Sequence, residues 1–186
     1  MKMRRITYLL IIISCITFVS CDGDKKEENN PQEKVKSTLK GYEELDLNQW
    51  GFQMEMMVPN AEENGEAQVT LTERGALEIV VGQGFGIEIM YGEGDIELLK
   101  MDLKDDLVFV SEIVKEEENS LIYKQDIPNS GVKTQNHFFY RAQIGADIYE
   151  VRDLIDGNYG LGLIEKMLEA SKTIKESKPT PVKTDA

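Results

Sequence analysis

Apolar and polar side chains alternate along four stretches in the first half of the chain. This period of two indicates β-strands that are buried on one face. We expect strands over residues 52–58, 67–72, 77–81 and 85–91. Gly82-Gln83-Gly84 separates the last two stretches, and a short glycine-rich link between alternating segments is typical of a hairpin turn.

Helical and strand periods are mixed in the second half. Asp95 is a suitable helix N-cap, and Ile96, Leu99 and Leu103 follow at helical spacing, which predicts a short amphipathic helix. The apolar residues 107–110 and 113–114 predict a central strand over 107–114, because both of its faces would be apolar. The remaining elements predicted are strands over 121–123, 138–144 and 148–155, and a last helix over about 160–175. The apolar face expected for this helix carries Leu161, Ile164 and Leu168, with Met167 and Ile174 beside it.

The predicted order is four strands, a helix, four strands and a helix. Short links favour antiparallel pairing. The fold class expected is therefore α+β, with a twisted antiparallel sheet and flanking helices that include a C-terminal helix, in one domain over residues 41–176. This layout is similar to the PsbP-like fold in element order over about residues 45–175. The resemblance implies accessory, assembly or binding roles rather than catalysis.

The first 21 residues have the features of an export signal. Lys2, Arg4 and Arg5 precede an apolar run of about 14 residues, which is short of the roughly 20 that a spanning helix needs. The run ends in Phe18-Val19-Ser20-Cys21. This ending resembles the lipobox of bacterial lipoproteins, with Phe18 where that family usually has Leu. The resemblance implies a signal peptide over 1–20 and lipidation of Cys21; the alternatives are a plain cleaved signal and a retained N-terminal helix.

Residues 21–40 are polar and charged, with Pro31 in their middle, and cannot bury enough apolar surface to fold. We expect a disordered acidic tether here and a flexible tail over 177–186. The run from Asp22 to Glu28 resembles the acidic export signal of some Gram-negative surface lipoproteins, although the enterobacterial sorting scheme would associate Asp22 with retention at the inner membrane. The predicted location is the cell envelope, lipid-anchored at the outer membrane, either periplasmic or surface-exposed.

The chain is strongly acidic, with 21 Lys and Arg against 34 Asp and Glu, a net charge of -13. Removing residues 1–20, which hold three cations and no acid, leaves 18 against 34, or -16. Such a charge repels phosphate backbones, so we expect no nucleic-acid partner. Cys15 would leave with the signal and Cys21 would carry lipid, so the mature domain should contain no disulfide or thiol site.

Motifs for cofactors and metals are weak. Gly82-Gln83-Gly84-Phe85-Gly86 has the wrong spacing for a dinucleotide loop and precedes a strand. Asp153, Asp156 and Asn158 do not match an EF-hand, because Ile155 occupies the third position. His137 is the only histidine, and a triad or zinc site needs further partners. We therefore predict no cofactor, no metal and no catalytic residue. Asp102, Asp105 and Asp106 are interpreted as a solvated cluster.

Charged and aromatic positions within the strands have structural explanations. Ion pairs between strands would account for the acids and bases on the outer side of the sheet, which are Glu55, Glu78, Glu88, Lys124, Arg141 and Arg152. Trp50, Phe139, Tyr149 and Tyr159 could line a ligand surface, but aromatic residues at strand spacing favour a core.

The sequence therefore predicts a lipid-anchored envelope protein whose folded domain has a non-enzymatic binding or scaffold role, with an envelope protein as partner. Two alternatives stay open. A carboxylate-based glycan hydrolase requires two acids facing each other across a cleft, roughly 5–9.5 Å apart. A small-ligand carrier requires an enclosed apolar pocket.

Overall fold

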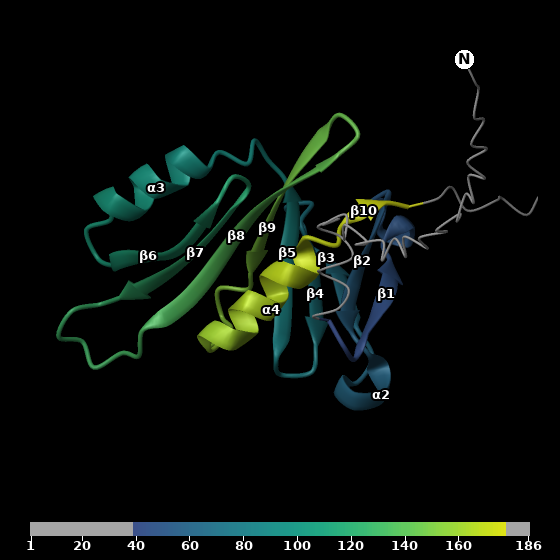
Figure 1. Ribbon diagram of the computed structural model, residues 1–186, viewed down its shortest axis with the longest axis horizontal. Coiled ribbons are helices and arrows are strands. Elements are labelled where there is room, and N and C mark those ends of the chain that lie inside the picture. Colours follow the sequence, from purple (N-terminus) through teal and green to yellow (C-terminus); the bar gives the residue numbers. More distant parts are fainter. Residues whose placement is uncertain (1–38, 178–186) are drawn as a thin grey trace, which may run out of the picture.

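Two antiparallel sheets and a long C-terminal helix organise residues 39–177, which are the residues that the computed structural model describes (Figure 1). The α+β class is confirmed. The predictions for the signal peptide, Cys21, most of the tether and the tail after Ser177 fall outside the described residues.

The larger sheet has seven strands in the order β3-β4-β5-β9-β8-β7-β6. These strands are β3 (Gln68–Leu71), β4 (Leu77–Val81), β5 (Phe85–Tyr91), β6 (Val110–Glu117), β7 (Ser120–Asp126), β8 (Gln135–Ile144) and β9 (Asp147–Asp153). The smaller sheet, in the order β1-β2-β10, contains β1 (Tyr42–Asp46), β2 (Met54–Pro59) and β10 (Lys175–Glu176). The helices are η1 (Asn48–Trp50), α2 (Ala61–Asn64), α3 (Ile96–Asp105) and α4 (Leu161–Ser171).

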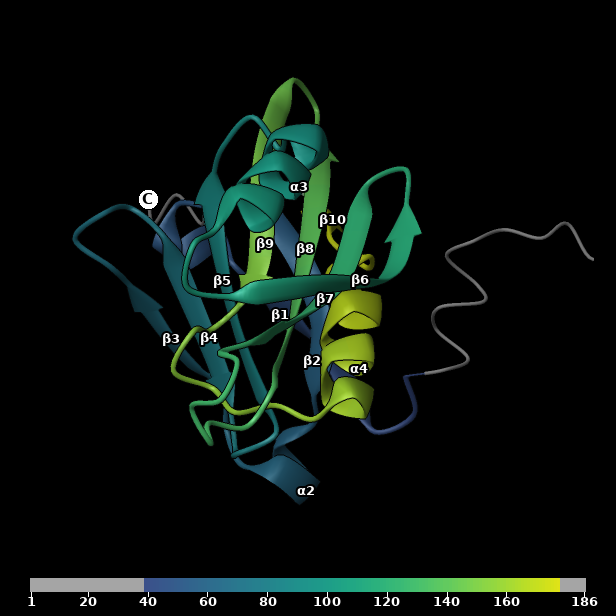
Figure 2. The same ribbon diagram turned by 90° about the vertical axis from the view of Figure 1, so that its left-hand side faces the viewer.

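The core lies between α4, one face of the large sheet and the small sheet. α4 packs mainly on β8 and also contacts β2 and β5 (Figure 2). Its buried side chains are Ile164, Met167, Leu168, Ala170 and Ser171, which agrees with the apolar face predicted for the last helix. Phe138, Ile87 and Met54, from three different strands, belong to the same buried cluster. Burial of apolar surface in this cluster is the main stabilising term.

The predicted hairpin between residues 77–81 and 85–91 is confirmed. Val81 pairs with Phe85, and Gly82 has a φ of 57°. A Cβ built on Gly82 would lie 2.9 Å from the carbonyl oxygen of Asn64, so both the backbone angle and the lack of space favour glycine.

The prediction of a central strand over 107–114 is wrong. β6 begins at Val110, runs to Glu117 and is an edge strand. The Asp106 carboxylate accepts hydrogen bonds from the amides of Val108 and Phe109, at 2.7 and 2.9 Å, which holds the start of the apolar run in a turn. These two bonds lower the pKa of Asp106. An apolar run can therefore indicate an exposed surface as well as a central strand.

The folded part is slightly longer than residues 41–176. Leu39 is buried in the core, and the Ser177 hydroxyl donates to Asn48 Oδ1 at 2.9 Å. Sequence patterns also missed β1 and β10. α4 ends at Ser171, and Lys175 then pairs with Glu55 of β2.

Candidate functional site

Exposed apolar side chains are concentrated in one part of the molecule. Of the twelve large hydrophobic residues exposed among residues 39–177, seven lie between positions 98 and 114. We call these seven the α3–β6 surface: Leu98, Met101, Leu107, Val108, Val110, Ile113 and Val114. Leu107 is 99% exposed and Met101 61%. Figure 1 shows that α3 and β6 lie at the end of the large sheet that is remote from the small sheet.

α3 is held to the body by few contacts. The Asp95 carboxylate accepts from the amide of Leu98 at 2.9 Å, which confirms the predicted N-cap. Gly94 precedes it with a φ of 65°, and its amide donates to Glu150 Oε1 at 3.1 Å. Lys100 Nζ lies 2.9 Å from Glu116 Oε1 of β6. None of the ten residues of α3 is buried, so this amphipathic helix lacks the full packing that usually stabilises one.

An acidic cleft of about 700 Å³ lies beside this surface. Its lining combines the start of α3 with the β6–β7 turn and Arg141 of β8. Acids face this cleft from both sides, among them Glu97 and Glu116, and Lys100 bridges these two carboxylates at 3.0 and 2.9 Å. The hydrolase alternative therefore has acids in a concave position, but Glu97 and Glu116 are paired with Lys100.

Glu117, which also lines the cleft, has a perturbed carboxyl. Hydrogen bonds from Lys115 and Lys172 lower the pKa of Glu117 to about 2. A general acid in glycoside hydrolysis needs the opposite shift, so that it holds its proton near neutral pH. Glu117 is therefore suited to a permanent negative charge and not to proton donation.

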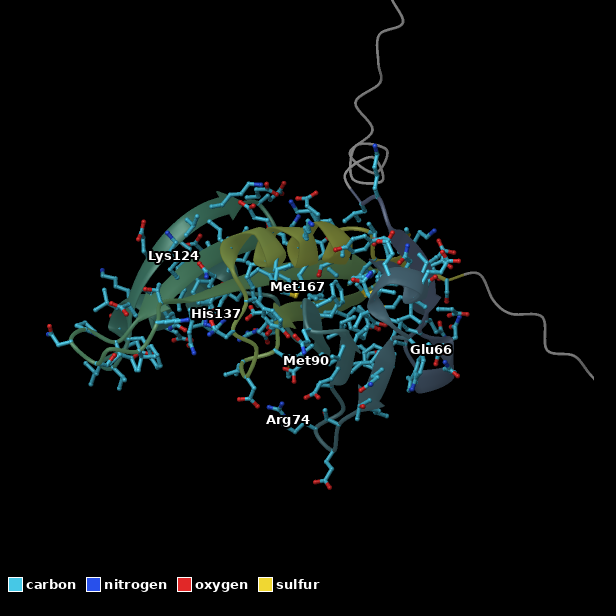
Figure 3. All side chains as sticks on the ribbon, turned by 90° about the horizontal axis from the view of Figure 1, so that it is seen from below. Glu66, Arg74, Met90, Lys124, His137 and Met167 are labelled. Carbon is cyan, nitrogen blue, oxygen red and sulfur yellow. The ribbon has the colours of Figure 1, made fainter. Side chains whose placement is uncertain are left out.

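His137 and Asp153 form a buried pair that joins β8 to β9. Asp153 Oδ2 lies 2.8 Å from His137 Nδ1, and Asp153 Oδ1 accepts from the amide of Phe138, also at 2.8 Å. Because a carboxylate only accepts, Nδ1 carries the hydrogen in this bond. The His137 side chain is 7% exposed and the Asp153 side chain 2%, and Figure 3 shows His137 inside the mass of side chains.

An aromatic ring lies against this pair. The Tyr123 ring lies 5.3 Å from the imidazole, and burial, with a smaller effect from Asp153, raises the pKa of Tyr123 to about 12. His137 Nε2 is buried and has no hydrogen-bond partner within the described part of the chain. A catalytic triad places its nucleophile at that nitrogen. In this structure, the hydrogen bonds of the pair link β8 to β9.

The structure places the other residues singled out in the sequence in separate environments. Asp153 belongs to the buried pair, whereas Asp156 and Asn158 are exposed beside a cleft of about 230 Å³. One of the predicted ion pairs between strands is present, from Glu55 to Lys175 of the neighbouring strand at 2.6 Å. Glu88 bonds instead to Arg74, in the link between β3 and β4, at 2.9 Å, and Arg152 bonds to Glu150 of its own strand at 2.6 Å. Figure 3 shows Arg74 projecting from the molecule.

The aromatic residues named in the sequence do not form one ligand platform. Phe139 is buried beneath the Arg152 guanidinium, which lies 4.9 Å from the ring centroid. Tyr149 is also buried, and its hydroxyl donates to the Tyr91 hydroxyl at 2.9 Å. Trp50 and Tyr159 are partly buried against the core. Core packing and ring contacts therefore explain most of this set.

Comparison of the chain with family models, with curated proteins and with solved structures found no match. The resemblance to the PsbP-like fold therefore stays a prediction. Within residues 39–177, no helix has the length and apolar character that crossing a membrane requires.

Sequence reasoning missed the two features that the structure makes most prominent. The only sign of the α3–β6 surface was the density of apolar residues at 107–110, which also fits a buried strand. The His137–Asp153 pair had no sequence signal, because its members are 16 residues apart on adjacent strands whose register is a tertiary property.

Proposed function

We propose that this protein is a lipid-anchored component of the cell envelope, and that its folded domain binds another protein without catalysing a reaction. The observation that carries the proposal is the α3–β6 surface. Seven exposed apolar side chains on one helix, one loop and one edge strand are more than the single scattered residues that a soluble surface normally shows. Such a concentration is typical of a surface that another molecule covers.

The alternatives have less support. The carrier needs an enclosed apolar pocket, and the region beneath the large sheet is filled by side chains at most 2% exposed, such as Phe85 and Phe138. The hydrolase needs a carboxylic acid that keeps its proton, whereas Glu117, which lines the acidic cleft, has a lowered pKa. A binding domain requires only an exposed area that a partner can cover, and the α3–β6 surface is such an area.

The anchor has a direct test. We expect a clickable palmitate analogue to label the protein in growing cells, and Cys21→Ala to abolish the label. Two or more acyl chains hold a domain stably, at about 0.8 kcal/mol per buried methylene. Cys15→Ala is the matched control, because it removes the only other cysteine and should leave the labelling intact. Equal labelling of wild type and Cys21→Ala would disprove lipidation at this residue.

The docking surface is tested by photo-crosslinking in intact cells. With a photo-reactive phenylalanine derivative in place of Leu107, we expect an adduct with a second envelope protein. The same derivative in place of Leu163, an exposed residue of α4, should give no such adduct. Adducts with lipid alone, or only with a second copy of this chain, would contradict the proposal.

A further inference from the structure

The helix α3 has apolar side chains on two opposite faces. Ile96, Leu99 and Leu103 are half-buried, and this inner face lies toward β6, which α3 contacts. Leu98 and Met101 each lie two positions after an inner residue, about 200° further round the helix, and are 52% and 61% exposed. A surface helix normally has one apolar and one polar face. The apolar side chains on the outer face of α3 are therefore left uncovered by the rest of residues 39–177.

Two acids complete this outer face. Asp102 and Asp105 lie four positions after Leu98 and Met101, respectively, and side chains at this spacing are neighbours on a helix. Both acids are exposed, and neither carboxylate has an ion pair or a hydrogen bond with another residue in the described part of the chain. We call Leu98, Met101, Asp102 and Asp105 the outer stripe of α3. The stripe combines two open apolar side chains with two negative charges that have no basic partner there.

The attachment of α3 keeps this stripe turned outward. Lys100, on the inner side of the helix, bonds to Glu116 of β6 at 2.9 Å, which limits rotation of the helix about its axis. Asp95 caps the first turn. Figure 1 shows α3 at the periphery of the molecule, with its far side open. Because the helix is ordered before a partner arrives, binding does not have to supply the entropy cost of forming it.

The composition of the stripe indicates the chemistry of what covers it. A purely apolar cover would take both carboxylates out of water without a counter-charge, which costs free energy. Lys or Arg side chains opposite the acids would offset this cost. A second copy of this chain would bring its own Asp102 and Asp105 against these acids if the two stripes met, and an anionic lipid surface would repel them as well. The stripe therefore fits a protein surface that is both apolar and basic.

We propose that the outer stripe of α3 lies in an apolar groove of the partner protein, and that Lys or Arg side chains of this groove pair with Asp102 and Asp105. This inference rests on the proposed function and specifies how the α3–β6 surface is recognised. Helices that bind in grooves use apolar anchors at i and i+3, which is the spacing of Leu98 and Met101. Leu107, which follows the helix and is almost fully exposed, extends the contact.

The first test places the photo-reactive phenylalanine derivative at single positions of α3 in the full chain, in intact cells. We expect adducts with one envelope protein from Leu98 and Met101, and little or no adduct from Glu97 and Lys104. All four positions are exposed, but Glu97 and Lys104 lie on the flank of the helix. A difference between the adjacent positions 97 and 98 is expected only if the partner contacts one face of an intact helix.

Charge reversal tests the basic residues of the groove. In the chain with the derivative at Leu107, Asp102→Lys combined with Asp105→Lys should reduce the adduct by at least about tenfold, as expected when close charge pairs are reversed. Lysines in the last turn of a helix are favourable, so α3 should stay folded, which circular dichroism checks. Glu62→Lys combined with Glu63→Lys, at exposed acids of α2, makes the same change in net charge and should leave the adduct unchanged.

A rescue experiment identifies the pairing directly. Mass spectrometry of the adduct locates the crosslinked segment of the partner, which should contain a Lys or Arg. Replacing that base with Asp should restore the adduct of the variant with lysines at positions 102 and 105. A crosslinked segment without bases, or a rescue that fails, would overturn the basic groove.

The inference and the proposed function can fail separately. Equal yields from positions 97, 98, 101 and 104 would overturn recognition of one helix face. If position 107 still gave an adduct with an envelope protein, the docking function would stand with a different binding mode. An unchanged adduct after reversal of Asp102 and Asp105 would remove the charge pairing in the same way. Adducts with lipid alone, or only with a second copy of this chain, would overturn both.

Discussion

Replacing Asp153 with alanine is expected to lower the free energy of unfolding by about 2–6 kcal/mol, because each buried donor that loses its acceptor costs about 1–3 kcal/mol. The substitution leaves two buried donors without their acceptor, His137 Nδ1–H and the amide of Phe138. Urea denaturation followed by the fluorescence of Trp50, the only tryptophan, measures the loss.

Three further variants separate the pair from general damage. Asp153→Asn keeps an amide oxygen that can accept one of the two bonds, so its cost should be smaller, about 1–2 kcal/mol. Asp153→Leu combined with His137→Phe removes both polar partners and should be less destabilised than Asp153→Ala. Asp156→Ala, at an exposed acid three residues away, should change stability by no more than about 0.5 kcal/mol. If Asp153→Ala behaved like Asp156→Ala, the pair would not stabilise the fold.

Sequence patterns predicted the parts of this fold that are determined by residues close together in the chain. The Asp95 cap, the apolar face of α4 and the glycine hairpin after Val81 each depend on residues within a few positions of one another. The same patterns gave the α+β class, because periods of two and of 3.6 alternate along the chain.

Placement within a sheet depends on partners that are distant in sequence, and here the predictions failed. Residues 107–114 are as apolar as a central strand, yet β6 is an edge because no later segment among the described residues pairs with its outer side. β10 is two residues long and depends on β2, more than 100 positions earlier, so it leaves no periodic signal. The His137–Asp153 pair was missed for the same reason, because its members meet only when β8 pairs with β9. The misplaced strand and the missed α3–β6 surface are thus one error, because exposed apolar residues were assigned to the interior.

The two adjacent phenylalanines of β8 are expected to respond differently to truncation. Both are 1% exposed, but Phe138 belongs to the core cluster beneath α4, whereas Phe139 lies on the opposite face, under Arg152. Phe138→Ala should cost about 3–5 kcal/mol, because rigid neighbours leave a cavity unfilled. Phe139→Ala should cost less, by about 1 kcal/mol or more, because the flexible arginine stem can move into the vacated space.

Denaturation of the two alanine variants, with Leu163→Ala on the exposed side of α4 as the control, measures this difference. Hydrogen exchange adds the location: Phe138→Ala should lower protection throughout β2, β5 and α4, which share its cluster, and Phe139→Ala chiefly in β7 and β9, where Leu121 and Arg152 lie opposite it. The contrast follows from the fold, since α4 packs on β8 from the side of Phe138 (Figure 2), whereas the flexible Arg152 side chain lies over Phe139. Equal costs with equal exchange patterns would mean that both faces of β8 belong to one cooperative core.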